Sequence, residues 1–195
     1  MQNLHLPNAD VRLQREFLKR EVADLLFTRL VRDIPWRQGH IRIQGRDIPE
    51  PRLTSWHGDG DYVYSGVRHA ANEWTRDLLG LKRIVEEASG AEYNSVLLNY
   101  YRPGHRDSIG MHADDEPEFG RNPTIASVSL GQVREFILAP MAGREGKRTA
   151  IALPHGSLLV MAGATQSNWK HGIEKERLPS RAGRINLTFR RLVGR

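Results

Sequence analysis

The stretch 184–190 alternates strictly between polar and apolar residues, and this pattern restricts the fold more than any other in the chain. Successive side chains of an extended strand point to opposite faces, so the pattern predicts a strand that directs Ile185, Leu187 and Phe189 into a core. The other face of this strand carries Arg184, Asn186, Thr188 and Arg190. That face is too polar for an ordinary packed interior.

The two arginines of this strand are spaced to hold a small dianion. At a rise of about 3.3 Å per residue, the Cα atoms of Arg184 and Arg190 lie roughly 20 Å apart. If both side chains lean inward, the remaining gap matches a short dicarboxylate such as a five-carbon 2-oxo acid, and guanidinium is well shaped to bind carboxylate. The alternative is an exposed edge strand with solvated arginines.

Three residues upstream form a candidate metal site. His112 and Asp114 are two positions apart, so in an extended strand they point the same way while Ala113 faces the packing behind them. His171 arrives from a distant part of the sequence. Two histidines and one carboxylate are the ligand set that holds Fe(II) on one face and leaves the other positions open. Short H-x-D matches also occur by chance, and a solvated surface pair is the alternative.

Taken together, these motifs resemble the AlkB family of Fe(II)- and 2-oxoglutarate-dependent dioxygenases, in particular the branch that removes alkyl groups from nucleic-acid bases. The similar segments occur in the family's order with family-like spacing, and they extend over roughly residues 36–192. They are 99–101, 112–116, 123–131, 155–161, 169–171 and 184–190, with looser similarity at 51–54 and 62–65. The arginine strand is the most specific of them.

The resemblance implies a role for each polar position. His112, Asp114 and His171 would ligate iron. The co-substrate 2-oxoglutarate would be held by Asn99, Tyr101, Arg184, Asn186, Thr188 and Arg190. Of these, Arg190 would bind its C1 carboxylate and Arg184, assisted by Asn186, its C5 carboxylate. With O2 the reaction would give succinate, CO2 and a hydroxylated methyl group that leaves as formaldehyde, so no side chain beyond the metal centre is needed as a general base.

The same resemblance points to residues that would contact the alkylated base, which must be single-stranded or flipped to reach buried iron. Tyr64 would stack on the base, with His112 across from it, and Tyr62 points to the same side of its strand. Asp115 and Glu116 would favour a cationic base such as 1-methyladenine or 3-methylcytosine. Two alternatives stay open: the tyrosines could belong to an ordinary half-buried strand, and Asp115 could pair with an arginine.

The stretch 41–46 alternates and then turns at a glycine, which predicts a hairpin. Relatives that repair duplex DNA carry a bulky aromatic residue at the position of Gln44, where it wedges into the base stack. Glutamine offers no large apolar plane to replace the lost stacking, so we expect a preference for single-stranded or mismatched DNA. Arg42, Arg46 and Arg52 are expected to contact the nucleic-acid backbone.

Composition favours a polyanionic partner without identifying it. The 195 residues suffice for one domain with a sizeable core, and the formal net charge is +6 with a pI near 10.0. There is no cysteine, which excludes disulfide scaffolds and thiolate metal sites. The start lacks the apolar run of a signal peptide and no run is long enough to span a bilayer, so we expect a cytoplasmic monomer with no membrane partner.

The hydrophobic pattern predicts an α+β, mainly β fold. Helices are expected over about 14–32 and 74–88, with inner faces formed by Phe17, Val22, Leu25, Leu26 and Leu30 and by Leu78, Leu81 and Val85. Short strands are expected at 95–101, 109–113, 124–130, 134–138, 149–153, 157–161, 169–173 and 184–192. Such strands with non-local metal ligands predict a jelly roll, the double-stranded β-helix that the resemblance also implies, with N-terminal helices packed on the sheet. We expect a single dioxygenase domain with a recognition region in 1–93 and a catalytic core in 94–195.

Three functional hypotheses remain. The leading one is a DNA-repair demethylase acting on N-alkylated bases, and the second is the same iron chemistry acting on RNA or on protein side chains. The third is a non-enzymatic jelly-roll module with a structural metal. A structural metal site needs no dicarboxylate clamp, so the arginine pair at 184 and 190 argues against the third hypothesis.

Overall fold

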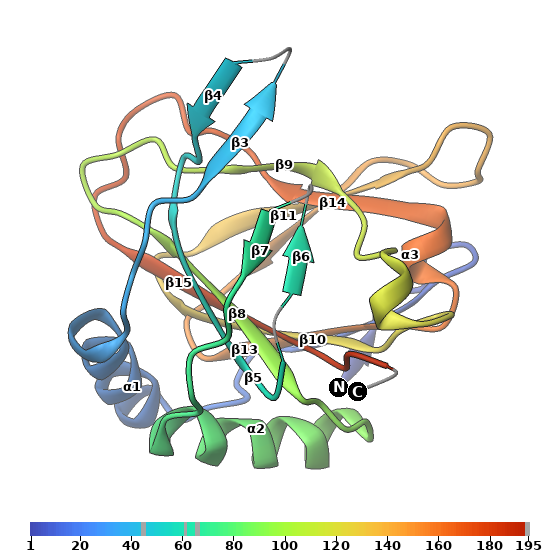
Figure 1. Cartoon of the computed structure of the whole chain (residues 1–195). Coiled ribbons are helices and arrows are strands. Elements are labelled where there is room, and N and C mark those ends of the chain that lie inside the picture. Colours follow the sequence, from blue (N-terminus) through green and yellow to red (C-terminus); the bar gives the residue numbers. More distant parts are fainter. Residues whose placement is uncertain (44–45, 61, 65–66, 194–195) are drawn as a thin grey trace.

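Two facing β-sheets form the body of the computed structural model, and two helices lie against the outer face of the larger sheet (Figure 1). The structure describes residues 1–43, 46–60, 62–64 and 67–193. In order across it, the larger sheet contains β1 (Gln2–Asn3), β2 (Asp10–Gln14), β13 (Ser157–Ala162), β10 (Ile125–Gly131), β15 (Arg184–Arg190), β8 (Ser95–Tyr101) and β5 (Leu53–Gly58). The smaller sheet contains β12 (Thr149–Leu153), β11 (Arg134–Pro140), β14 (Trp169–Ile173) and β9 (Ile109–His112). The predicted mainly β, double-sheet fold is confirmed.

The arginine strand β15 lies inside the larger sheet, paired with β10 on one side and β8 on the other. Ile185, Leu187 and Phe189 are completely buried, as predicted. They pack toward the helices with apolar residues of β8 and β10. The alternative of an exposed edge strand is therefore wrong, because both edges of β15 are hydrogen-bonded to neighbouring strands.

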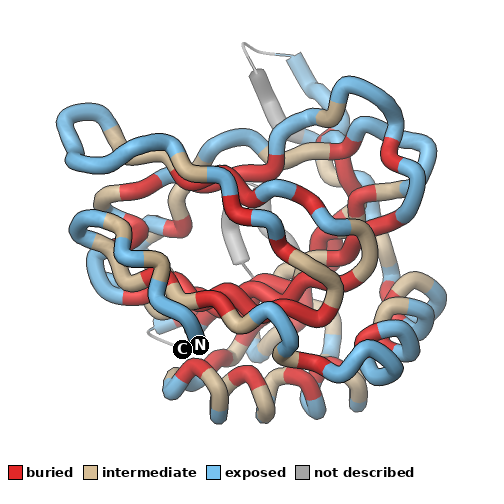
Figure 2. Tube along the Cα trace, turned by 180° about the vertical axis from the view of Figure 1, so that it is seen from behind, coloured by how far each residue is buried: buried red, intermediate tan, exposed pale blue. Residues whose placement is uncertain are grey.

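Buried residues gather along the strands of the larger sheet, whereas the connecting loops are mostly exposed (Figure 2). One apolar cluster fills the layer between this sheet and the helices. A second cluster lies between the two sheets and includes Leu13, Phe136 and Trp169. The space between the sheets is therefore apolar at one end, and the polar face of β15 lines the other part of it.

The N-terminal segment contributes a strand that sequence reasoning missed. In β2, Val11 lies opposite Met161 and Leu13 opposite Leu159 of β13. Pairing with a strand far along the chain holds these residues, which the local pattern alone does not mark. Only the two apolar residues of β2 are buried, which is too short an alternation to distinguish a strand from a loop.

The first helix, α1 (Arg20–Asp33), begins later than predicted. The chain before it turns, and the backbone N–H groups of Phe17 and Leu18 both donate to the carbonyl of Gly156, at 3.0 and 2.9 Å. The helix ends at Ile34, as the following proline predicts.

The buried face of α1 also differs from the predicted one. Val22 and Leu25 are about half exposed, at 51% and 53%, whereas Ala23, Leu26 and Leu30 are buried. The small side chain of Ala23 lies on the face toward the sheet, so Val22 and Leu25 face solvent. The predicted inner face is therefore correct at Leu26 and Leu30 and wrong at Val22 and Leu25.

The second helix, α2 (Arg76–Ser89), agrees with the prediction in position and face, because Leu78, Leu81 and Val85 are buried. The Thr75 side chain caps its start by accepting from the backbone N–H of Leu78 at 3.2 Å. Gly90 ends it in the left-handed region with φ of 73°.

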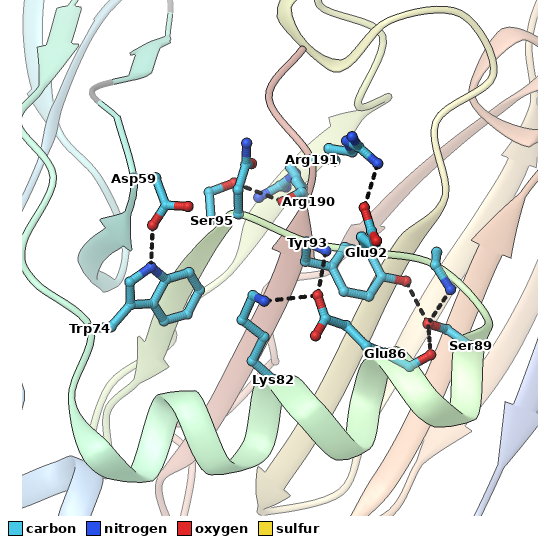
Figure 3. Close-up of polar contacts among 12 residues, drawn as sticks. Asp59, Trp74, Lys82, Glu86, Ser89, Glu92, Tyr93, Ser95, Arg190 and Arg191 are labelled. Atoms are coloured by element: carbon cyan, nitrogen blue, oxygen red, sulfur yellow. Dashed lines mark hydrogen bonds and ion pairs between the residues drawn. The ribbon is translucent and has the colours of Figure 1, made fainter. Parts of the chain in front are cut away.

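Polar contacts tie the end of α2 to the start of β8 (Figure 3). The Tyr93 hydroxyl donates to Ser89 Oγ at 3.0 Å, and the Tyr93 N–H donates to Glu86 Oε1 at 2.7 Å. Lys82 pairs with the same Glu86 carboxylate at 2.8 Å. These contacts fix where β8 enters the larger sheet, and β8 carries two of the predicted co-substrate residues.

Two small hairpins stand beside the sheets. β3 (His40–Ile43) pairs with β4 (Arg46–Pro49), which confirms the hairpin predicted at 41–46. β6 (Tyr62–Tyr64) pairs with β7 (Val67–His69). Gln44 and the side chains of Tyr62 and Tyr64 lie outside the described residues, so their predicted substrate contacts stay predictions.

A short helix, α3 (Thr165–Asn168), precedes β14, and a 3-10 turn (Pro117–Phe119) follows the H-x-D segment. In the part of the chain that the structure describes, none of the helices has the length and apolar character that a bilayer crossing requires.

Candidate metal and co-substrate site

The polar face of β15 belongs to rows of side chains that run across the larger sheet. One row places Thr54 of β5, Asn99 of β8, Asn186 of β15 and Ser129 of β10 side by side in register. A neighbouring row places Arg184 beside Tyr101. Because these rows face the smaller sheet, they form the polar floor of a pocket whose volume, including its open mouth, is about 990 Å³.

The smaller sheet brings the three predicted metal ligands to this pocket. His112 at the end of β9 lies directly opposite His171 of β14, and Asp114 follows two residues later. The ligand atoms of His112, Asp114 and His171 all lie within 4.8 Å of one another. Asp114 and His171 are buried and His112 is partly exposed, so the alternative of a solvated H-x-D surface pair is wrong.

Hydrogen bonds leave one ligand atom of His112 and one of Asp114 available. His112 Nδ1 lies 2.9 Å from the carbonyl of Gly110, which can only accept, so this nitrogen carries the proton and Nε2 is free to bind a metal. Arg190 Nη2 donates to Asp114 Oδ1 at 2.7 Å. Asp114 Oδ2 has no hydrogen-bond partner among the described residues and lies 3.8 Å from His171 Nε2.

Two further contacts hold the ligand-bearing segments. The buried Gln166 of α3 accepts from the backbone N–H of Asp114 at 3.0 Å. Phe136 of β11 stacks on the His171 ring with centroids 5.2 Å apart. Sequence reasoning missed both residues, because nothing in the local pattern connects them with a ligand far away in the sequence.

The electrostatics of the site favour the metal-binding protonation states. Burial alone would raise the pKa of Asp114, but the positive charges of Arg190 and the neighbouring histidines outweigh it and lower that pKa to about 2. Burial and the nearby His112 lower the pKa of His171 to about 3. At neutral pH the pair therefore offers a carboxylate and a neutral imidazole, which are the forms that bind a divalent ion.

At the other end of the pocket, Arg184 is a buried cation. Its side chain is among the largest that are completely buried, and Nη2 donates to Ser129 Oγ at 2.8 Å. Nε and Nη1 have no hydrogen-bond partner among the described residues, and none of those residues supplies a carboxylate to this guanidinium. Burial lowers the pKa of Arg184 to about 10, which leaves it charged at neutral pH.

Tyr101 completes this end of the pocket. Two guanidinium groups lie over its ring, that of Arg184 at 5.4 Å from the ring centroid and that of Arg134 at 5.8 Å. Burial raises the pKa of the Tyr101 hydroxyl, so it stays a hydrogen-bond donor. A neutral donor next to an unpaired cation is a suitable environment for a carboxylate.

Asn186 and Thr188 lie on the pocket floor but already bind each other and their neighbours. The Asn186 amide donates to Ser127 Oγ at 2.6 Å, and its Oδ1 accepts from the Thr188 hydroxyl at 2.8 Å. These contacts hold the side chains of Asn186 and Thr188 in place between Arg184 and Arg190. Direct binding of a ligand by Asn186 or Thr188 stays a prediction.

Of the predicted substrate residues, Arg52 lies in an unexpected place. It is only 6% exposed and lines the pocket, where it contacts Asn99 and Glu50. The prediction that it contacts a nucleic-acid backbone is wrong, because a guanidinium buried between these two side chains does not reach solvent. Sequence reasoning also missed Glu50.

The acidic pair directly follows Asp114 of the candidate metal site. Asp115 is exposed and Glu116 is partly buried. Among the described residues no arginine pairs with Asp115, so the alternative that it serves as an arginine's partner finds no support. Apolar pocket walls that sequence reasoning missed are Trp56 and Leu97.

Comparisons with known proteins agree with this geometry. The sequence model of the 2OG-Fe(II) oxygenase superfamily matches residues 10–190. Alpha-ketoglutarate-dependent dioxygenase alkB homolog 3 of Bos taurus is 43% identical over 89% of this chain and 63% of its own length. DNA oxidative demethylase ALKBH2 of Mus musculus is 35% identical over 88% of this chain and 75% of its own. The chain thus spans less than two thirds of the alkB homolog 3 sequence.

Solved structures agree on the fold. The structure of OsALKBH1 superposes with a TM-score of 0.66 at 18% identity and covers 97% of this chain and 99% of its own. The family model extends over nearly the whole described chain, and the range that it matches includes the ligand triad and the arginine strand. This chain therefore belongs to the 2OG-Fe(II) oxygenase superfamily.

Proposed function

We propose that this chain is an Fe(II)- and 2-oxoglutarate-dependent dioxygenase that removes alkyl groups from N-alkylated bases, such as 1-methyladenine and 3-methylcytosine, in DNA. The observation that carries the proposal is the buried Arg184, to which no described residue supplies an anion, in the same pocket as the triad of His112, Asp114 and His171. A metal and a dicarboxylate in one pocket are what this chemistry requires.

The residues present fit both groups. Iron would be held by His112 Nε2, Asp114 Oδ2 and His171, a two-histidine, one-carboxylate set of the kind found in non-heme iron oxygenases. The co-substrate would lie along the pocket floor with its far carboxylate at Arg184 and Tyr101. When bound, iron and 2-oxoglutarate would use O2 to hydroxylate the alkyl carbon while 2-oxoglutarate becomes succinate and CO2.

The protein's own residues orient and enclose this chemistry. Arg190 fixes Asp114 Oδ1, which leaves the other carboxylate oxygen directed at the metal position. Trp56, Leu97 and Phe136 form apolar walls that exclude water from the reacting side of the pocket.

Charge supports the nucleic-acid part of the proposal. The net charge of +6 suits a polyanion, and the acidic residues Asp115 and Glu116 suit a cationic alkylated base. The relatives named as demethylases and alkB homologues support the same class. We further propose a single-stranded substrate and a monomeric, cytoplasmic enzyme; the same chemistry on RNA or protein side chains is the second candidate.

The proposed function is tested with four methylated oligonucleotides: single- and double-stranded DNA, single-stranded RNA and double-stranded RNA. Each is incubated with the protein, Fe(II), 2-oxoglutarate and O2, and methyl loss is followed by mass spectrometry. We expect the fastest loss from single-stranded DNA. Faster loss from RNA would favour the second candidate, and co-substrate turnover without loss from any of them would exclude base repair.

A further inference from the structure

Arg52 joins two other buried polar residues in the pocket. Its Nε donates to Asn99 Oδ1 at 2.8 Å, and its Nη2 donates to Glu50 Oε1 at 2.8 Å. All three side chains are buried, with 6% of Arg52, 6% of Glu50 and 3% of Asn99 exposed. A buried ion pair is costly to desolvate, so its presence in a pocket calls for a reason beyond stability.

The contact with Arg52 fixes which end of the Asn99 amide faces the pocket. A guanidinium can only donate, so it must meet the Asn99 oxygen and the amide cannot flip. Because its oxygen accepts from Arg52, the Asn99 amide turns its N–H groups away from the guanidinium. They lie on the pocket floor beside Asn186, where a bound carboxylate or keto oxygen can accept from them.

Glu50 keeps Arg52 in this position. It neutralises the guanidinium, and its own backbone is tied to the base of the β3–β4 hairpin: the Glu50 N–H donates to Gly39 O at 2.8 Å and Gln38 Nε2 donates to Glu50 O at 3.0 Å. Arg52 itself therefore has two of its donors occupied by protein. Through its Nε–H it can act on a bound ligand by way of Asn99.

We propose that Arg52 is a positioning residue that holds the Asn99 amide with its N–H groups toward the bound co-substrate, with Glu50 as the counter-ion. This inference rests on the proposed function, because it takes 2-oxoglutarate as the ligand of the pocket. It gives Arg52 a role in co-substrate affinity, whereas the sequence suggested that Arg52 contacts the nucleic-acid backbone.

The test is a double-mutant cycle on co-substrate binding, measured by calorimetry on protein loaded with Mn(II) under anaerobic conditions. Asn99→Ala removes hydrogen bonds to a charged ligand and should weaken binding about tenfold to a hundredfold. Arg52→Lys keeps a charge for Glu50 but loses the fixed guanidinium geometry, and should weaken binding about three- to tenfold. In the Asn99→Ala background, Arg52→Lys should have no further effect.

Arg102→Lys is the matched control, because Arg102 forms a comparable ion pair with the buried Asp107 at 2.8 Å outside the pocket. It should leave 2-oxoglutarate affinity unchanged. If Arg52→Lys does not fold, the same cycle is run with Arg52→Met combined with Glu50→Leu, which removes both charges together.

The outcomes distinguish failure of the proposed function from failure of the positioning role of Arg52. Absence of 2-oxoglutarate binding by the wild-type protein would overturn the proposed function. If the wild type binds but the effects of Arg52→Lys and Asn99→Ala simply add, or Arg52→Lys has no effect, the positioning role is overturned and the proposed function stands.

Discussion

At the scale of single residues, Arg184 combines two opposing effects. Two nitrogens of its buried guanidinium have no hydrogen-bond partner among the described residues, which costs stability, and the same atoms can bind a carboxylate strongly. Affinity for the co-substrate is thus obtained at the expense of stability in its absence.

We therefore expect Arg184→Met to change two measurements in opposite directions. It should weaken 2-oxoglutarate binding by about tenfold to a hundredfold, since a charge-assisted hydrogen bond contributes about 1.5–3 kcal/mol, and it should raise the melting temperature of the co-substrate-free protein. Binding of Mn(II) should remain nearly unchanged, because the metal ligands belong to other strands. Loss of metal with unchanged 2-oxoglutarate affinity would instead indicate a structural role for β15.

The metal ligands give a second prediction at this scale. His112→Ala, Asp114→Ala or His171→Ala should each abolish Fe(II)-dependent succinate formation, because two remaining ligands cannot hold the ion in an open geometry. Metal content after gel filtration checks the cause. Arg102→Lys, outside the pocket, should retain the metal. Full turnover by any of the three alanine variants at ordinary iron levels contradicts the assigned site.

The sequence identified those pocket residues whose spacing has a direct geometric meaning. The i,i+2 relation places His112 beside Asp114 and Arg184 on the face of Arg190, and both placements are found in the structure. Gln166 and Glu50 could not be predicted in this way. They reach the pocket from other elements through tertiary contacts, and no local period marks them.

At the scale of elements, the turn between β10 and β11 determines how closely the start of β15 packs against β10. Gly131 lies opposite Arg184, has φ of 85°, and a Cβ at this position would lie 2.3 Å from the carbonyl of Gly183. An L residue is disfavoured there both by its backbone angle and by the backbone atom that blocks it.

Gly131→Ala should therefore lower the free energy of unfolding by about 2–4 kcal/mol. Gly80→Ala is the matched change within α2, where no heavy atom lies near the added methyl group. It should stabilise by about 0.5–1 kcal/mol, since alanine is the better helix former. Urea denaturation of both variants checks the pair, and equal effects of the two changes would contradict the steric argument.

Strands were predicted more successfully than the segments that precede them. Residues 95–101, 149–153 and 169–173 match the observed strands β8, β12 and β14 in both bounds. In the stretch 10–19, by contrast, β2 is held by its pairing with β13, and the following turn is held by hydrogen bonds to Gly156, so both depend on residues far along the chain.

At the scale of the whole molecule, the proposed function makes strand preference depend on how an alkylated base leaves its strand. A base in a duplex must be unstacked at a cost of a few kcal/mol per step, and Gln44 is a poor wedge for the gap. We expect a higher kcat/KM on an unpaired than on a paired 1-methyladenine oligonucleotide, and weaker binding as salt rises.

The variant Gln44→Phe tests the same idea within one protein. It should improve activity on duplex substrate more than on single strands, because an aromatic ring replaces part of the lost stacking. Equal or greater wild-type activity on the fully paired duplex would show that the hairpin does not set the strand preference.

The most direct measurement of the central claim is the stoichiometry of products from single-stranded DNA that contains 1-methyladenine. Succinate, formaldehyde and repaired adenine are quantified in the same reaction, with wild-type protein and with His171→Ala. We expect equal amounts of the three products from the wild type and none from the variant. Succinate formed without formaldehyde and repaired adenine, or repaired adenine formed without 2-oxoglutarate, would contradict it.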